Sequence, residues 1–152
     1  MQFFLLTHER EHVKKTNTGQ LIRHCLPNTY FTIWQRAQPD KKLLTLIEAG
    51  NIALVYPANN TQPNNTINEF ENFILIDSTW QEARKIYNRS PYLHGLPHLQ
   101  ISPRTTSQYK LRRNQVSGGL CTAECAIELL HAKAHVEAAN NLDALFKSFM
   151  TK

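Results

Sequence analysis

A short apolar run that stops at an acidic residue limits the possible folds of this chain more than any other stretch. Residues 73–76 (Phe-Ile-Leu-Ile) are too few for a helix and are of the types that favour a buried strand. The run ends at Asp77, after which Trp80, Ala83, Arg84 and Tyr87 recur at helical spacing. The pattern predicts a strand, a turn and a helix. In an open α/β sheet, ligands bind at the carboxyl ends of strands, where the following helix begins.

The residues alone leave two interpretations of this turn open. Asp77 and Trp80 stand where a ligand site is expected. Ser78 or Thr79 is equally a natural N-cap, and Thr79 with Glu82 matches a capping box, in which case Trp80 is simply a core residue. The first interpretation predicts a functional carboxylate and indole, and the second predicts a structural turn.

The rest of the chain alternates between strand and helix patterns. Further strands are predicted at residues 3–7, 30–34, 52–56 and 98–101. Helices are predicted to open at residues 17–19, to present an apolar face over residues 43–49 and end at Gly50, to run from Leu120 to Ala134, and to include residues 142–149. Residues 58–68, rich in Asn, Thr and Pro, predict a loop. The alternation predicts one α/β domain over residues 1–152, with a mainly parallel sheet flanked by helices.

Composition and motif content exclude several classes of site. The three cysteines, Cys25, Cys121 and Cys125, contain no Cys-x-x-Cys pair, so neither a disulfide framework nor a four-ligand zinc site is predicted. The seven histidines match no metal-ligand spacing, and we expect no metal. The chain lacks the glycine-rich phosphate loops and the Gly-x-Ser-x-Gly nucleophile turn. Neither a signal peptide nor a membrane-spanning run is present, so we expect a cytoplasmic protein with reduced thiols and no membrane partner.

The distribution of charge favours a polyanionic partner. The formal net charge is +5, and from Arg84 to Ala123 there is no Asp or Glu. Seven of the 17 Lys and Arg residues fall in this segment, and three tyrosines are interleaved with them as possible base-stacking partners. Because the segment follows the predicted strand, turn and helix directly, we expect it to bind nucleic acid.

Four ordered motifs resemble those of the DTW-domain family. They are Ile76-Asp-Ser-Thr-Trp80, Ser90-Pro-x-Leu-x-x-Leu-Pro97, Ser107-x-Tyr-x-Leu-Arg-Arg113 and Leu120-Cys-Thr-Ala-Glu124. Glu9, Asn17-Thr18 and the strand end at Leu54-Val-Tyr-Pro57 also look familiar, so the resemblance covers roughly residues 7 to 130. Many relatives begin with a cysteine cluster that looks zinc-binding. This chain has no such cluster, so no metal is carried over.

The resemblance implies a reaction and a fold. It implies transfer of the 3-amino-3-carboxypropyl group of S-adenosylmethionine to N3 of a tRNA uridine, which releases methylthioadenosine. The implied fold is SPOUT-like, with a knotted sheet, which is a rare exception to the rule against knots. The resemblance does not name the uridine.

The residues suit this chemistry. Asp77 would accept the N3 proton as general base or would position the uracil, and these two roles remain open. Trp80 would offer a π-face to the sulfonium or to adenine. The residues expected to bind the cofactor are Tyr56, Pro57, Ser78, Thr79, Trp80, Leu120, Thr122 and Glu124, although Glu124 is equally explained as an acid at a helix N-terminus. The residues expected to bind RNA are Arg84, Arg104, Tyr109, Lys110, Arg112 and Arg113.

Two other functions remain compatible with the sequence. One is an S-adenosylmethionine-dependent RNA methyltransferase of the same SPOUT architecture. The other is a non-catalytic RNA-binding module, in which Asp77 and Trp80 are a cap and a core residue.

Overall fold

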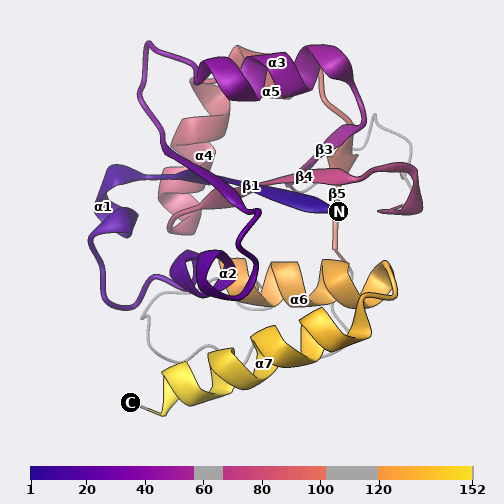
Figure 1. Ribbon diagram of the computed structural model, residues 1–152. Coiled ribbons are helices and arrows are strands. Elements are labelled where there is room, and N and C mark those ends of the chain that lie inside the picture. Colours follow the sequence, from indigo (N-terminus) through magenta and orange to yellow (C-terminus); the bar gives the residue numbers. More distant parts are fainter. Residues whose placement is uncertain (57–66, 102–119, 152) are drawn as a thin grey trace.

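The computed structural model describes residues 1–56, 67–101 and 120–151, which form a five-stranded parallel sheet between two layers of helices (Figure 1). The sheet order is β2-β1-β4-β3-β5, and every neighbouring pair is parallel. The predicted α/β class and parallel sheet are therefore confirmed. The strands are β1 (Gln2–Thr7), β2 (Tyr30–Ile33), β3 (Ile52–Val55), β4 (Asn72–Asp77) and β5 (His98–Leu99).

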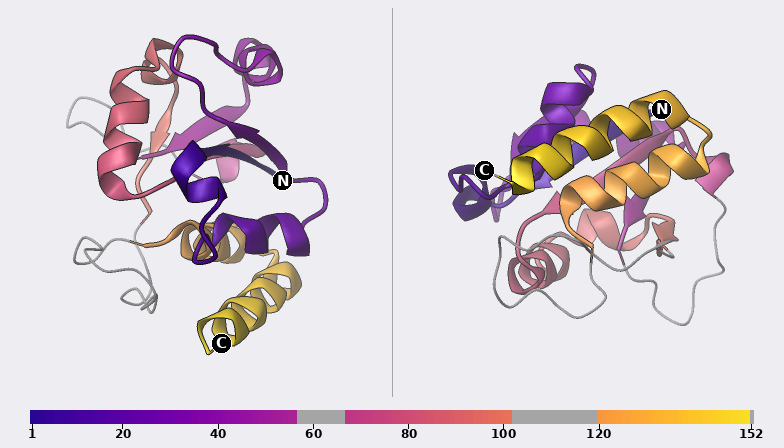
Figure 2. Two further views of the ribbon diagram at one scale, coloured as in Figure 1. Left: turned by 90° about the vertical axis from the view of Figure 1, so that its left-hand side faces the viewer. Right: turned by 90° about the horizontal axis from the view of Figure 1, so that it is seen from below.

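The helices divide between the two faces of the sheet. One layer is built from α2 (Gly19–Cys25), α6 (Thr122–Ala132) and α7 (Val136–Met150), which lie below the sheet in Figure 1. The other contains α3 (Lys41–Ala49), α4 (Trp80–Asn88) and α5 (Pro91–His94), which lie above it. Two short elements, α1 (Glu9–His12) and the 3₁₀ turn η1 (Ile67–Glu69), complete the described part of the chain. The views in Figure 2 show α6 and α7 packed side by side.

The central strand explains why its apolar run is continuous rather than alternating. Phe73 and Leu75 belong to the core between the sheet and the layer of α2, α6 and α7. Ile74 and Ile76 belong to the core between the sheet and the layer of α3, α4 and α5. A parallel strand covered on both faces needs apolar residues at consecutive positions. By the same alternation, Asp77 faces the α2 and α6 layer.

The predicted turn after β4 is present. Thr79 caps α4: its side chain accepts from the Glu82 N–H at 3.2 Å, and the Glu82 carboxylate accepts from the Thr79 N–H at 3.1 Å. This confirms the capping box. The interpretation of Trp80 as a core residue is wrong, because the side chain is 37 % exposed. Capping by Thr79 and exposure of Trp80 therefore occur together.

Other predicted elements are confirmed with changed bounds. The last predicted strand is shorter, at two residues, and the helix expected from Leu120 begins at Thr122 and ends at Ala132, since Ala134 has a positive φ of 62°. The sequence did not predict α1, α5 or η1. Most of the predicted polar loop lies outside the described residues, at 57–66. The path from β5 to α6, on which a knot depends, also lies outside them, at 102–119.

Candidate active site

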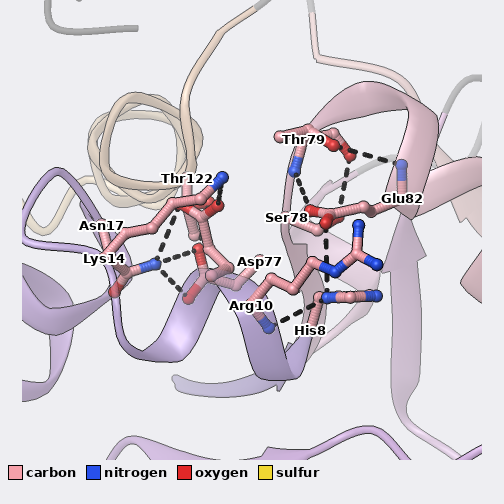
Figure 3. Close-up of polar contacts among 10 residues, drawn as sticks. His8, Arg10, Lys14, Asn17, Asp77, Ser78, Thr79, Glu82 and Thr122 are labelled. Carbon is pink, nitrogen blue, oxygen red and sulfur yellow. Dashed lines mark hydrogen bonds and ion pairs between the residues drawn. The ribbon is translucent and has the colours of Figure 1, made fainter.

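Asp77 is the centre of a buried hydrogen-bond network at the carboxyl edge of the sheet (Figure 3). Its carboxylate accepts from Asn17 Nδ2, at 3.0 Å to Oδ1 and 2.9 Å to Oδ2. Thr122 Oγ1 donates to Oδ1 at 2.8 Å, and Thr7 Oγ1 donates to Oδ2 at 3.2 Å. The three donors come from the end of β1, the residues before α2 and the first turn of α6. The carboxylate therefore joins three segments that are far apart in the sequence.

Burial is the main influence on the protonation of Asp77. Removal from water raises the pKa of the Asp77 carboxyl above its ordinary value, and the nearby Glu11 carboxylate raises it further. The hydrogen bonds from Asn17, Thr122 and Thr7 act in the opposite direction because they stabilise the charged form. The net result is a raised pKa, so Asp77 is a stronger base than an exposed aspartate.

Gly19 makes room for this carboxylate. A Cβ atom at Gly19 would lie 2.7 Å from Asp77 Cγ and closer still to Oδ2. Only a hydrogen at this position lets the first turn of α2 approach Asp77. The sequence predicted a helix opening at Asn17-Thr18-Gly19 but gave no reason for the glycine, and the structure gives a steric one.

The start of α6 is fixed to the same region. The N–H of Ala123 donates to Thr18 Oγ1 at 3.1 Å, across 105 positions of sequence. Glu124 is buried, and its carboxylate accepts from the Cys121 N–H at 3.0 Å as part of a capping box. Glu124 thus lies in the first turn of α6, as its explanation as an acid at a helix N-terminus predicts, and it also belongs to a capping box. Among the donors to Asp77, Thr7 and Asn17 are buried, and Thr122 alone is partly exposed.

Three aromatic rings form a column on the other face of the sheet. The ring of Tyr56, just after β3, stacks on Trp80 with centroids 5.5 Å apart and on Tyr87 with centroids 4.3 Å apart. The Tyr87 hydroxyl lies 2.8 Å from His98 Nε2, and His98 Nδ1 lies 2.6 Å from the Leu96 carbonyl oxygen. A carbonyl oxygen only accepts, so His98 Nδ1 carries a proton and donates to the Leu96 oxygen, and in the neutral imidazole the Tyr87 hydroxyl donates to Nε2. We call Trp80, Tyr56 and Tyr87 the aromatic column.

The Asp77 network and the aromatic column share one edge of the sheet but lie on opposite faces. Asp77 contacts α2 and α6, whereas Tyr56 and Tyr87 pack with the core under α3, α4 and α5. In Figure 3, Asp77 points toward Asn17 and Thr122, away from the group formed by Ser78, Thr79 and Glu82. The enclosure that raises the Asp77 pKa thus includes side chains of the α2 and α6 layer. The indole of Trp80 stacks elsewhere, on Tyr56.

The remaining predicted site residues divide between the described and undescribed parts of the chain. Arg84 is exposed on α4, and Ser78 and Leu120 are partly exposed. Pro57, Arg104, Tyr109, Lys110, Arg112 and Arg113 lie outside the described residues. Within the described ranges, no three His, Cys, Asp or Glu side chains gather as a metal site. Nor does any helix in those ranges have the length and apolar character needed to cross a membrane.

Sequence reasoning missed Thr7 and Gly19 as parts of the site, and it used Asn17 only as a helix signal and as part of the family resemblance. Thr7 ends an apolar strand directly beside Asp77 in the parallel register, so the signal was the polar residue closing that strand. Asn17 binds Asp77 through Nδ2 while its Oδ1 accepts from the Gln20 N–H at 3.0 Å. Its helix-capping role and its site role therefore use different atoms of one side chain.

Comparison with known proteins places this arrangement in a family. A parallel α/β domain with polar and aromatic groups at the carboxyl edge of its sheet is a common type of ligand-binding protein. The sequence model of the DTW domain matches residues 1–152. The chain therefore belongs to the DTW domain family.

Curated relatives carry a functional name. The chain is 25 % identical over 137 residues to a Drosophila melanogaster protein named tRNA-uridine aminocarboxypropyltransferase 2, covering 85 % of this chain and 55 % of the relative. Proteins of the same name from Macaca fascicularis and Mus musculus are 25 % and 26 % identical over 135 residues, covering 81 % of this chain and 44 % of each relative. The chain thus spans about half the length of the curated relatives it matches. No solved structure gives a significant match.

Proposed function

We propose that this chain is an enzyme that transfers the 3-amino-3-carboxypropyl group of S-adenosylmethionine to N3 of a uridine in tRNA. The names of the curated relatives support this reaction class. The observation that carries the proposal is the placement of a basic carboxylate and an exposed, stacked indole at the same edge of the sheet.

The aromatic column is suited to the group donor. The exposed face of Trp80 can receive a flat adenine ring or a sulfonium cation, and Tyr56 holds the indole in place from its other side. S-Adenosylmethionine would supply an electrophilic carbon bonded to a positively charged sulfur. In the transfer, the uracil N3 forms a bond to this carbon, the carbon–sulfur bond breaks with its electron pair going to sulfur, and methylthioadenosine leaves.

The proton on N3 also needs an acceptor. Asp77 is 2 % exposed and is enclosed by its donors, so direct contact with a uracil would require the network to open. Thr122 offers a route without such opening, because it is a partly exposed residue whose hydroxyl donates to Asp77 at 2.8 Å. We assign Thr122 Oγ1 as the atom that accepts the N3 proton while its own proton passes to Asp77 Oδ1. The raised pKa of Asp77 favours its holding this proton.

Mass spectrometry of unmodified tRNA after incubation with the protein and S-adenosylmethionine tests the proposed reaction. The proposal expects a nucleoside heavier by one aminocarboxypropyl group, with methylthioadenosine as the second product. A gain of one methyl group, with S-adenosylhomocysteine, would instead establish the methyltransferase alternative. Binding of tRNA without either product would establish a non-catalytic RNA-binding module.

Substitution at Thr122 tests the proton route. Thr122→Val removes the hydroxyl with little change in volume, and Thr122→Ser retains it. We expect single-turnover transfer by Thr122→Val to be about 100-fold slower or more, as for loss of a general base, with the Ser variant much closer to wild type. Equal rates for the two variants would contradict the route through Thr122. Because Thr122→Val also removes a hydrogen bond from the buried carboxylate, the rates are compared under conditions in which urea unfolding shows both variants to be fully folded.

A further inference from the structure

A second stretch of the chain is free of acidic residues, and apart from Asn17, Thr18 and Gly19 the site described above does not use it. From His12 to Pro39 there is no Asp or Glu. In the structure this stretch forms the end of α1, all of α2 and all of β2, with the segments between them. Its basic and imidazole side chains are His12, Lys14, Lys15, Arg23, His24 and Arg36. Of these, Lys14 forms an ion pair, 3.4 Å from the Glu11 carboxylate just outside the stretch.

The stretch includes an edge of the sheet. Strand β2 is first in the sheet order and pairs with β1 through Phe4↔Tyr30 to Thr7↔Ile33, so its other side has no neighbouring strand among the described residues. Its side chains are partly buried rather than enclosed. This edge is therefore an accessible surface of the described chain.

Both faces of β2 carry an aromatic ring beneath a cation. On the α2 face, the Arg23 guanidinium carbon lies 4.2 Å from the centroid of Phe31. On the α3 face, Lys42 Nζ lies 4.3 Å from the centroid of Tyr30. The His12 imidazole also stacks on Phe31, at 5.1 Å between centroids. The exposed edge of the sheet thus lies between cationic groups on its two faces.

Arg23 is a partly exposed residue whose Nε is buried without a hydrogen-bond partner in the described part of the chain. A phosphate contact would therefore fall to its terminal Nη groups. A guanidinium held flat over an aromatic ring has a fixed orientation, and its N–H groups match the spacing of two phosphate oxygens. Its place in the last turn of α2 also favours a positive charge, but the helix dipole does not account for the stacking on Phe31.

We propose that Arg23, Phe31, Tyr30 and Lys42 form a docking surface for the phosphodiester backbone of RNA along the β2 edge. The occupant is argued from charge complementarity. Residues 12–39 contain no acid, and the Arg23 and Lys42 cations lie over rings on the two faces of β2, while Asp40, just after the stretch, forms a side-chain hydrogen bond with Tyr30. The identification of the RNA as tRNA rests on the proposed function. None of these four residues belongs to the acid-free segment from Arg84 to Ala123.

Edge protection is the competing explanation. Exposed edge strands are commonly flanked by charged residues, which prevent pairing with another chain. Edge protection predicts that loss of the cations causes aggregation and leaves RNA affinity unchanged. RNA docking predicts a change in the salt dependence of binding.

The test is a titration of unmodified tRNA transcript with the full chain over a series of KCl concentrations, followed by fluorescence anisotropy. The variants are Lys42→Met, which changes an exposed side chain, and Arg23→Met with Lys42→Met, which retains apolar cover over both rings. The control is Lys147→Met on α7, where Asp143 lies 2.9 Å from the lysine and already balances its charge.

We expect the double variant to reduce the slope of log affinity against log salt by about 1 to 2, since each phosphate contact contributes roughly 0.7 to 0.9. Lys42→Met alone should give about half of this reduction, and the control should leave the slope unchanged. A wild-type slope in both β2 variants, with or without aggregation, would overturn the proposal, as would an equal reduction in the control. Binding is measured without turnover, so absence of transfer would overturn the proposed function alone.

Discussion

The Asp77 network and the aromatic column occupy the same edge of the sheet, yet they are built in opposite ways. Asp77 is 2 % exposed and is held by donors from three segments of the chain. Trp80 is 37 % exposed and is supported mainly by one neighbouring ring. The first region is polar and closed, and the second is apolar and open.

This difference separates two tasks that the sequence places only three residues apart. A closed network fixes protonation and geometry because its polar groups satisfy one another away from water. An open ring contributes to folding weakly and keeps one face available for a ligand. Substitutions in the network should therefore act first on stability, and substitutions in the column should act first on binding.

The largest effect on stability is expected from Gly19→Ala. The added methyl group overlaps the Asp77 carboxylate and forces either α2 or Asp77 to move, which should lower the free energy of unfolding by about 1 to 3 kcal/mol. Urea unfolding measures this change. Gly95→Ala is the matched control, since its Cβ would meet nothing within 4 Å, and it should be neutral or slightly stabilising. Equal effects at the two glycines would refute the packing of Gly19 against Asp77.

A smaller effect, and one on binding, is expected from Trp80→Leu. Loss of the stacking surface should weaken binding of methylthioadenosine by about 1 to 2 kcal/mol, or roughly 5- to 30-fold, as measured by calorimetry. The free energy of unfolding should change by only about 0.5 kcal/mol, because the ring is exposed. Trp80→Phe keeps a ring and should retain most of the affinity. A large loss of stability with unchanged affinity would show that the indole is structural.

The smallest effect is expected in the pH dependence of stability, because three hydrogen bonds oppose the influence of burial on Asp77. Its folded pKa is raised, so above the ordinary aspartate value of about 3.9 the native state binds more protons than the unfolded state. Its contribution to the free energy of unfolding therefore falls as pH rises from that value through the folded pKa, and is constant above it.

Asp77→Asn should lack this contribution. The difference between variant and wild type, measured by urea unfolding at several pH values, should shift in favour of the variant as pH rises through that window. Taking the difference removes the contributions of other acids, such as Glu71, whose pKa is lowered by its hydrogen bond with Lys133. A difference that is flat with pH, or that shifts the other way, would contradict the raised pKa.

Local patterns predicted most of the fold. Hydrophobic runs located the five strands, and capping signals located the start of α4, because these features depend on residues close together in the sequence. The short elements α1 and α5 were missed because each has only four residues, too few to produce a periodic pattern. Such short helices depend on tertiary packing rather than on intrinsic propensity.

The site was predicted less completely, for a physical reason. Asp77 and Trp80 were identified from the turn after β4, but the partners of Asp77 lie 45 to 70 positions away in sequence. Their meeting depends on the order and register of the strands, which a local pattern does not contain. Successive side chains of a strand point to opposite faces of the sheet. Asp77 therefore points to the face of Leu75, whereas Tyr56, which follows Val55 in β3, points to the opposite face once the pairing of Val55 with Leu75 is known.

The contacts at the start of α6 also bear on how the protein is made. Thr122 reaches back to Asp77, and Ala123 reaches back to Thr18. A chain emerging from the ribosome presents Asp77 after Thr7 and Asn17 but long before these later partners, so the enclosure of the carboxylate stays incomplete until α6 has been synthesised. The corner around Asp77 is thus among the last parts of the molecule to be completed, and a nascent chain interrupted before residue 120 would lack the contacts from α6.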